Sequence, residues 1–254
     1  MKRYAALLCV GVVLSVVVLK APAAWLTPLI KHYSQGAVTV TQSWGTVWHG
    51  SALLRLHRSE KEVLNVPQAV VWTLDLSRIF ELSIHASLSS AALQAPVKLA
   101  VQGSTLRVGA GRYALPADTL NTFGAPFNTL KPSGNIALQW GSFVLDTRAN
   151  TAPAVALVVT IDQLRMALTG AQVLGNYTLS ANPMDTQRYA LALRTDSTAP
   201  VDLALSGQGS VDLKGKVQFE LRSKAASPQA QGRVQTLLNF LGRRQGDEYV
   251  LNVN

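Results

Sequence analysis

The histidines and acidic residues are the side chains from which a metal site or an acid–base pair could be built. His49 and His57 lie in one strand-like run, which puts them on the same face but about 26 Å apart at about 3.3 Å per residue. This separation is too long for both to bind one metal ion. Glu60 and Glu62 flank Lys61, a pattern that favours a solvated turn over a paired-carboxylate site.

The sequence also lacks the common catalytic motifs. It contains no G-x-S-x-G elbow, no H-E-x-x-H pair and no phosphate-binding loop. Gly109 and Gly111 fall in a strand-like run rather than at a strand-to-helix junction, so they do not form a dinucleotide fingerprint. The single cysteine, Cys9, excludes an intramolecular disulfide and a zinc site built from cysteines. We therefore expect no enzyme activity, no metal and no cofactor.

Composition indicates a folded protein with no nucleic-acid partner. The chain has 254 residues, of which 48% are hydrophobic and 15% charged, a balance that argues against disorder. The formal net charge is +9, and residues 1–31 contribute four basic residues and no acid. The other 19 basic and 14 acidic residues are spread thinly along the chain, whereas a nucleic-acid surface needs clustered basic residues.

The N-terminus is typical of a membrane anchor. Lys2 and Arg3 precede sixteen uncharged residues that begin at Tyr4 and end at Leu19. A spanning helix needs about 20 apolar residues, so we expect a helix that is slightly short or that continues past Lys20. The Lys20 side chain can then extend (snorkel) to the membrane–water interface on the far side, with Trp25 as an aromatic anchor.

A cleaved signal peptide is the alternative interpretation of this segment. Residues 21–24 are small or proline, as at a signal-peptidase site. The apolar run is longer than the usual core of a signal peptide, which favours the anchor. Either interpretation puts residues 32–254 outside the cytoplasm, which in a bacterium is the periplasm.

Beyond residue 36 the dominant pattern is alternation of apolar and polar residues, which predicts β-strands. Residues 211–222 alternate throughout, and Val217 and Phe219 lie on their apolar face. Shorter alternating runs occupy residues 80–84, 97–101, 136–140, 189–193 and 249–253. Turn signals separate these runs at residues 103–104, 132–134, 141–142, 182–183 and 207–209.

Helical pattern is scarce in this region. Val234, Leu237, Leu238 and Leu241 stand at i, i+3, i+4 and i+7 and predict a helix that Gly242 caps. Residues 118–123 could form another helical turn. We therefore predict a mainly β chain in which an N-terminal transmembrane helix precedes a long antiparallel meander, curled into an open or partly closed sheet, and a short C-terminal helix. The expected division is an anchor over residues 1–31 and one β-rich domain over residues 32–254.

The segment W-G-T-V-W-H-G-S-A, residues 44–52, opens the β region. Gly45 and Gly50 permit a tight turn or bulge, and Trp48 brings a large apolar ring whose N–H needs a partner. The structural interpretation is that Trp48 closes the end of the first hairpin. The functional interpretation is that exposed aromatic residues of this segment bind a partner protein.

Two motifs resemble those of protein N of the bacterial type II secretion system. Residues 45–52, which include Gly45, Thr46, Trp48 and Gly50, match the family's G-T-[LVI]-W-x-G-x-A stretch. The family's closing L-L-x-x-L-G-x-x-x-G pattern has counterparts in this chain at Leu237, Leu238, Leu241, Gly242 and Gly246. The resemblance implies an accessory protein of the inner membrane with a periplasmic domain and no known active site. The implied partners are other subunits of the secretion system, in the inner membrane or at the outer-membrane pore.

The layout also resembles, more weakly, that of AsmA-like envelope proteins. This second resemblance concerns architecture and implies a periplasmic module that binds or transfers lipid. In that alternative the apolar face of the meander lines a lipid groove, whereas in the first it forms an ordinary core. Alternation alone does not separate the two, because both need one apolar face.

Overall fold

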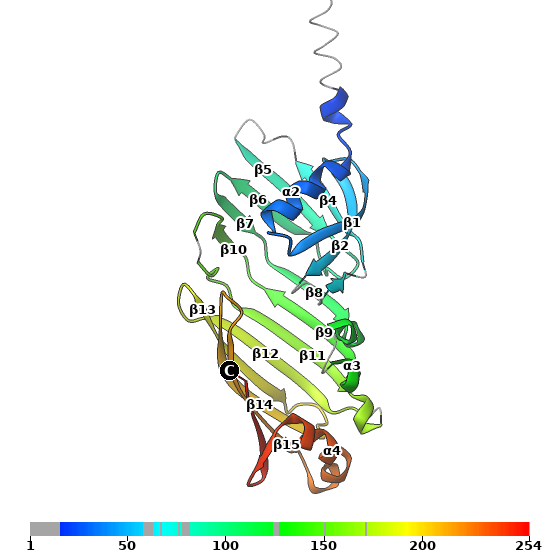
Figure 1. Ribbon diagram of the computed structural model, residues 1–254, viewed down its shortest axis with the longest axis vertical. Helices are drawn as coiled ribbons and strands as arrows, with labels where there is room; N and C mark the ends of the chain where they lie inside the picture. The colour runs from blue at the N-terminus through cyan, green and yellow to red at the C-terminus, as the bar shows by residue number, and fades with distance from the viewer. Residues whose placement is uncertain are drawn as a thin grey trace, which may run out of the picture. The chain divides into compact units, whose positions relative to one another are not determined.

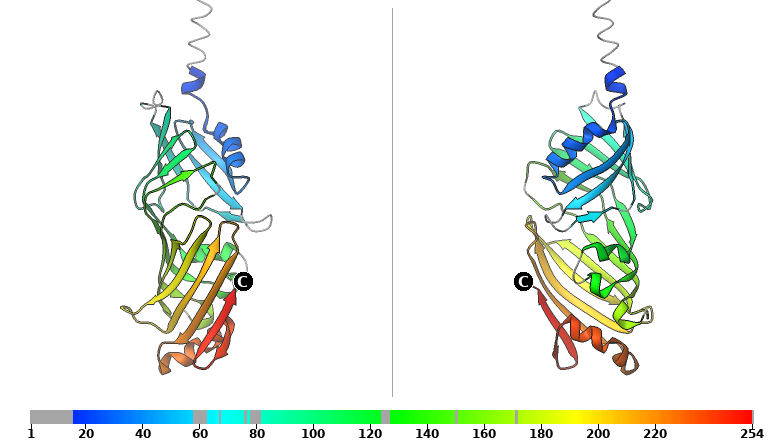
Figure 2. Two further views of the ribbon diagram at one scale, coloured as in Figure 1. Left: turned by 90° about the vertical axis from the view of Figure 1, so that its left-hand side faces the viewer. Right: turned by 45° about the vertical axis from the view of Figure 1, so that its right-hand side comes forward.

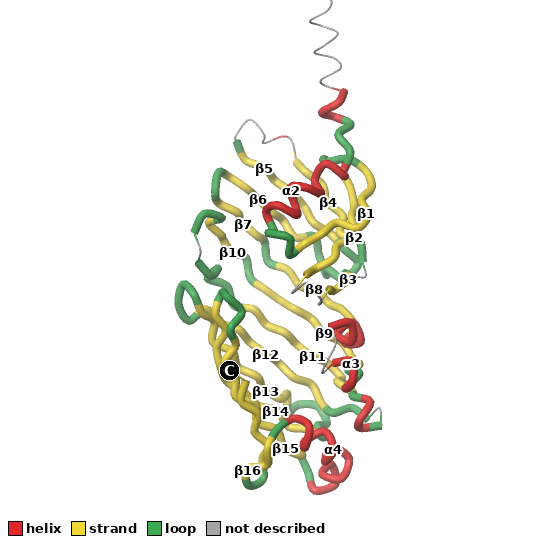
Figure 3. The backbone as a smooth tube through the Cα atoms, viewed as in Figure 1, coloured by secondary structure: helices red, strands yellow, loops and turns green. Residues whose placement is uncertain are grey.

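The structure is a computed structural model that describes residues 16–57, 63–66, 68–75, 77, 82–123, 127–149, 151–170 and 172–253. The chain is mainly β, as the alternation predicts, and its strands form two antiparallel sheets (Figures 1 and 3). The chain divides into two compact units. The first comprises Met1–Ala91 and Pro96–Gly103, and the second comprises Ala92–Ala95 and Ser104–Asn254.

In the described part of the first unit, short helices precede an antiparallel run of strands. Its strands follow the order β1-β2-β4-β5-β6, with β3 beside β2. The elements are η1 (Ala23–Trp25), α2 (Leu26–Tyr33), β1 (Val38–Gly45), β2 (His49–His57), β3 (Val63–Asn65), β4 (Val70–Asp75), β5 (Ser83–Ser89) and β6 (Val97–Gln102). Its core is small and gathers Ala23, Ala52 and Trp72, against which Leu26 and Leu54 pack.

The outer edge of β1 is protected by the chain itself. The Ser34 hydroxyl accepts a hydrogen bond from the Val38 N–H at 3.1 Å and lies 3.2 Å from the Val38 carbonyl oxygen, to which it can donate. A register shift between Val40 and Gln42 interrupts the ladder to β2. Capped groups and bulges of this kind make an edge a poor template for another strand.

The second unit is a nine-stranded antiparallel sheet with helices at one end. The strand order of this sheet is β16-β17-β15-β14-β13-β12-β11-β9-β8; β7 and β10, which pair with each other, are not part of it. The strands are β7 (Thr105–Val108), β8 (Gly111–Pro116), β9 (Ser133–Trp140), β10 (Phe143–Asp146), β11 (Leu157–Arg165), β12 (Gly175–Pro183), β13 (Arg188–Asp196), β14 (Leu203–Asp212), β15 (Val217–Ala225), β16 (Arg243–Gln245) and β17 (Glu248–Val253). The helices are η3 (Ala117–Phe123), α3 (Phe127–Leu130), η4 (Ala167–Thr169) and α4 (Pro228–Leu241).

The core of the second unit lies where these helices meet the sheet (Figure 2). Leu130 of α3 and Val234, Leu237 and Leu238 of α4 pack there against Tyr177 and other sheet residues. The C-terminal helix is thus confirmed, and its start is set by Ser227, whose hydroxyl accepts a hydrogen bond from the Ala230 N–H. Such an N-cap satisfies one of the free N–H groups of the first turn. The helical turn predicted at residues 118–123 is also present, as η3.

Three details of the strand prediction are wrong. Residues 211–222 are not one strand, because β14 ends at Asp212 and its carboxylate accepts the N–H groups of Lys214 and Lys216 in a turn. Residues 207–209 are not a turn but lie inside β14, where both glycines make room for the ring of Phe219. Residues 182–183 still belong to β12.

The membrane helix is not confirmed. Among the described residues no helix is both long and apolar enough to span a bilayer. Tyr4 and Cys9 lie outside the described residues, and so do Glu60, Glu62 and Phe80. The helical turn at residues 16–19, which ends at Leu19, is described and exposed.

Candidate functional site

The residues of the first motif form the turn between β1 and β2. The Thr46 N–H donates to the His49 carbonyl oxygen at 2.9 Å, and the His49 N–H donates to the Thr46 hydroxyl at 3.1 Å. These two bonds close the loop that carries Val47 and Trp48. The threonine of the motif therefore fixes the turn through both its backbone and its side chain.

The two glycines of the motif are required by close backbone approach. Gly45 has a φ of +84°, and a Cβ there would lie 2.5 Å from the His49 carbonyl oxygen. A Cβ on Gly50 would lie 2.6 Å from the Trp72 ring and 2.7 Å from the Trp44 carbonyl oxygen. The space beside Gly50 is thus filled by Trp72, whose Nε1 donates to the Val47 carbonyl oxygen at 2.8 Å.

The turn holds the end of the N-terminal segment. Trp48 Nε1 donates to the Val18 carbonyl oxygen at 2.8 Å, and the Val47 N–H donates to the Ala21 carbonyl oxygen at 2.9 Å. Pro22 forms an isolated bridge with Thr46. The first carbonyl belongs to the helical turn that ends at Leu19, so the motif ties the last turn of that helix to the sheet.

The small residues after Lys20 belong to this junction. Ala21 and Ala23 are buried, with 5% and 2% of their surface exposed, and Ala23 packs with Ala52 and Trp72. The prediction from sequence did not include Ala21, Ala23 or Trp72 among the site residues. Two small residues around Pro22 were visible in the sequence, but they match a cleavage region equally well. Lys20 and Trp25 are both exposed beside the junction.

The second motif builds the end of α4 and the closing hairpin. Leu237 and Leu238 are fully buried and Leu241 packs against the same core. Gly246 has a φ of +64° in the turn between β16 and β17. Gly242 is not a left-handed cap, because its backbone is extended; a Cβ there would lie 2.5 Å from the Val250 carbonyl oxygen. It is a glycine because the chain leaving α4 passes directly against β17.

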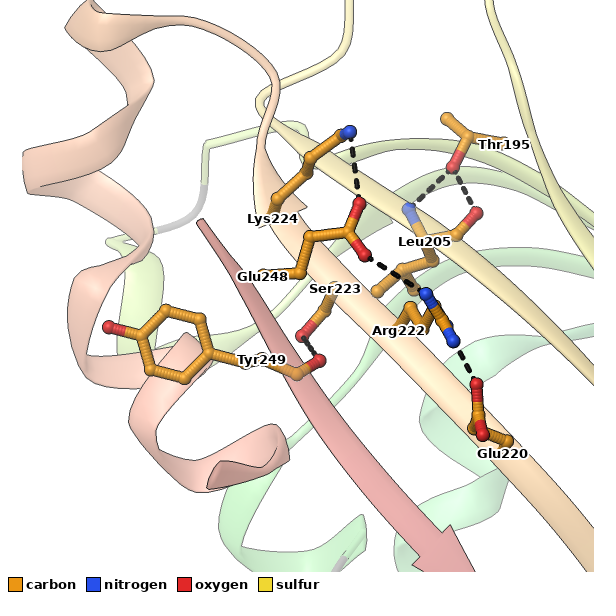
Figure 4. A network of polar contacts seen from close by, with 8 residues as sticks. All are labelled: Thr195, Leu205, Glu220, Arg222, Ser223, Lys224, Glu248 and Tyr249. Carbon is orange, nitrogen blue, oxygen red and sulfur yellow. Dashed lines mark hydrogen bonds and ion pairs between the residues drawn. The ribbon is translucent and has the colours of Figure 1, made fainter. Parts of the chain in front are cut away.

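A row of ion pairs fastens this hairpin to β15 (Figure 4). Glu248 of β17 lies between Lys224 and Arg222, at 3.1 Å from the Lys224 Nζ and 3.7 Å from the Arg222 guanidinium. Arg222 also contacts Glu220 at 2.6 Å. On the opposite face of β15, the Ser223 hydroxyl donates to the Tyr249 carbonyl oxygen at 3.4 Å. Because these charges are exposed, they favour register more than stability.

The two motif junctions lie in different units, the first motif in the first and the second in the second. Within the described ranges no group of three or more His, Cys, Asp and Glu residues could hold a metal ion. His49 and His57 are the first and last residues of β2, as the single-strand interpretation predicts. Their partners differ, since His49 contacts Thr73 and His57 contacts Thr39.

The family comparison covers both junctions. The profile of the family described as type II secretion system (T2SS), protein N, matches residues 36–252. The chain belongs to the type II secretion system protein N family. Membership implies a role in type II protein secretion and interaction with other subunits of the system. No curated protein and no solved structure matches the chain significantly.

The buried Tyr177 of this protein N family member makes the stability of the fold depend on pH in the alkaline range. Its hydroxyl donates to the Leu203 carbonyl oxygen at 2.8 Å, and burial, with a further contribution from the charge of Asp202, raises its pKa well above 10. In the unfolded chain a tyrosine loses its proton near pH 10. The stabilisation is therefore complete below about pH 10 and is lost as the pH rises further.

We expect the free energy of unfolding to fall steeply above about pH 10, and Tyr177→Phe to make that fall shallower. The phenylalanine variant also loses the hydrogen bond to Leu203, which costs about 1 kcal/mol at neutral pH. Urea denaturation between pH 8 and pH 11 measures both effects. An unchanged slope above pH 10 in Tyr177→Phe would show that this phenol does not contribute.

Proposed function

We propose that the protein is a non-enzymatic accessory or assembly component of the inner-membrane part of the type II secretion system, taking part in export of exoproteins across the outer membrane. In this proposal residues 1–31 form a cytoplasmic tip, a membrane anchor and a juxtamembrane segment, and residues 32–254 lie in the periplasm. The observation that carries it is the junction between the first motif and Val18, because the family's own motif residues bind the end of the apolar N-terminal segment.

The buried alanines favour an anchor over a cleaved signal peptide. Cleavage after Ala23 would remove Val18 and Ala21 from the first unit, together with the carbonyl groups that Trp48 and Val47 bind. It would also empty the position that Ala23 fills in the core. The Trp48 and Val47 N–H groups would lose these hydrogen bonds, which costs free energy. The junction thus supports retention of the N-terminal segment in the mature protein.

A fixed junction has a mechanical purpose in such an assembly. A single anchor on a flexible linker leaves a domain free to tumble, whereas hydrogen bonds from the sheet to the end of the helix restrict it. Strands and exposed aromatic residues of the periplasmic part are then presented to other subunits in a limited range of directions. Strand edges that are not capped as β1 is bind partner strands readily, which makes β-augmentation at such an edge a suitable mode of contact.

Replacing Trp48 with phenylalanine tests the junction. The variant keeps an aromatic ring but loses the donor to the Val18 carbonyl, so we expect the junction to weaken by about 1 kcal/mol, or about fivefold in its open population. Limited proteolysis of the detergent-solubilised full chain should then cleave the segment near residues 18–24 about fivefold faster. Trp44→Phe is the control, since Trp44 lies half-exposed on β1 of the same hairpin.

The secretion readout uses a strain that lacks the gene. We expect wild-type protein and Trp44→Phe to restore exoprotein to the culture medium, and Trp48→Phe to restore less. Native mass spectrometry of the protein, extracted gently from its own membranes, adds the intact mass and the co-purifying subunits. A mass that lacks the first twenty-odd residues would overturn the anchor.

A second candidate function, periplasmic lipid binding, is favoured by one feature of the second unit. Directly paired residues form an apolar row across eight of its strands: Tyr113, Leu138, Val159, Leu179, Leu193, Gly207, Leu221 and Leu251. All but Gly207 are only half-buried or exposed. A neighbouring row from Trp140 and Leu157 through Leu191 to Phe219 and Val253 is likewise not buried.

Helices cover only the end of this face that contains Tyr177 and Tyr249. An apolar sheet face that is incompletely covered is suited to bind something apolar. Leu191→Glu should abolish bound lipid in native mass spectrometry without unfolding the sheet, since the side chain is half-buried rather than buried. The same lipid load in the variant and in the wild type would exclude this face as the lipid site.

A further inference from the structure

Helix α2 packs on the protein at its start and leaves other apolar side chains exposed. Leu26, which begins the helix, packs against the core of the first unit, as does Ala23 just before it. Trp25, Leu29 and Tyr33 stand at i, i+4 and i+8, so they share one face of the helix. That face is open, with 55%, 51% and 83% of their respective surfaces exposed.

An isolated exposed apolar residue needs no explanation, but an aligned Trp, Leu and Tyr stripe does. Tryptophan and tyrosine are the residues enriched at the boundary between a bilayer and water, because their rings are apolar at one end and polar at the other. The stripe therefore has the composition of a surface that meets lipid headgroups.

The position of α2 in the chain brings this stripe near the level of the membrane surface. Trp25 lies five residues after Lys20, a distance of at most about 18 Å even in a fully extended chain. The intervening residues are not extended, since η1 is helical and the Val47 N–H binds Ala21. In Figures 1 and 2, a short connection joins the helical turn at residues 16–19 to α2, which runs obliquely across the sheet of the first unit.

The charges around the stripe suit an anionic surface. Residues 1–59 contain no Asp or Glu. Lys20 precedes the stripe and Lys31 lies between Leu29 and Tyr33 in sequence, and both lysines are exposed. Basic side chains at this level are attracted to anionic lipid headgroups, and no acidic side chain of the segment opposes that attraction.

We infer that α2 is an interfacial helix, in which Trp25, Leu29 and Tyr33 insert among the headgroups of an anionic bilayer while Leu26 packs on the sheet. This inference rests on the proposed inner-membrane anchor. The helix adds a second contact with the membrane beside the anchor, and together with the Trp48 junction it sets the tilt of the first unit relative to the bilayer.

Site-specific fluorescence on the full chain tests the interfacial helix. Leu29→Cys and Ile84→Cys, each in a Cys9→Ser background, are labelled with the environment-sensitive dye NBD and reconstituted into phosphatidylethanolamine–phosphatidylglycerol vesicles. Ile84 is a matched control, because it is an exposed aliphatic residue of the same unit with 52% of its surface accessible. We expect lipids that carry a spin label near the headgroup to quench the dye at position 29 at least twofold more than at position 84.

Equal quenching at the two positions would overturn the inference. Repeating the measurement in phosphatidylcholine vesicles tests the charge argument, which predicts weaker quenching at position 29 and is wrong if quenching is unchanged. Alkaline carbonate extraction of the same vesicles separates the two proposals. A chain that is extracted contradicts the anchor itself, whereas a chain that stays integrated with an unquenched Leu29 position contradicts only the interfacial helix.

Discussion

Gly45→Ala should destabilise the first unit by about 2–5 kcal/mol, whereas Gly36→Ala should cost only about 1–2 kcal/mol. The two glycines have almost the same φ, +84° at Gly45 and +83° at Gly36. A Cβ on Gly36 meets nothing within 4 Å, while a Cβ on Gly45 lies 2.5 Å from the His49 carbonyl oxygen and 2.9 Å from the Gly50 Cα. The difference in destabilisation between the two variants therefore measures the cost of steric crowding separately from the cost of backbone strain.

Urea denaturation of the detergent-solubilised full chain, followed by tryptophan fluorescence, measures the Gly45 effect. Four of the five tryptophans, at positions 25, 44, 48 and 72, lie in the first unit and report mainly on it. Because the crowded atoms belong to the turn that binds Val18 and Ala21, Gly45→Ala should also expose the segment near residues 18–24 to protease. If the two alanine variants lose the same stability, the close approach at Gly45 is not what requires glycine there.

The strands were largely predictable because each has one apolar and one polar face. Alternation located β6, β9, β13 and β17, and the spacing of Val234, Leu237, Leu238 and Leu241 located α4. The prediction from sequence failed where a glycine could either mark a turn or make space inside a strand. Gly207 and Gly209 have the same sequence appearance as a turn, but their function is to accept the ring of Phe219 from the neighbouring strand, and that contact depends on register between strands.

The first motif was predictable as a turn but not as a junction. The glycines and Trp48 indicated a tight hairpin end, and the structure places Trp48 in the turn between β1 and β2. Its partner, the Val18 carbonyl, could not be predicted, because a backbone acceptor thirty residues away leaves no trace in residue type. Trp72 was missed for a similar reason, since a tryptophan in an apolar strand is indistinguishable from any other core residue until the register of Gly50 and Trp72 is known.

The closing motif allows a second comparison within one helix. Leu238 is fully buried in the core of the second unit, whereas Phe240, the largest apolar side chain of the same segment, has 49% of its surface exposed. In the L-L-x-x-L-G pattern Leu238 occupies a motif position and Phe240 a variable one. The motif thus corresponds to the buried stripe of α4 rather than to its most hydrophobic residues.

Leu238→Ala should lower the free energy of unfolding of the second unit by about 2–5 kcal/mol, because it leaves a cavity among residues from α4 and the sheet that have little room to relax. Phe240→Ala removes more atoms but should cost less than about 1 kcal/mol, since its ring is half in water. Proteolysis of the full chain at increasing urea concentration, read out by the fragments released from the second unit, measures the stability of that unit in both variants. Equal losses would mean that α4 is held by its whole surface. A selective loss at Leu238 would mean that the family's leucines position the closing hairpin, which begins where Gly242 passes directly against Val250 of β17.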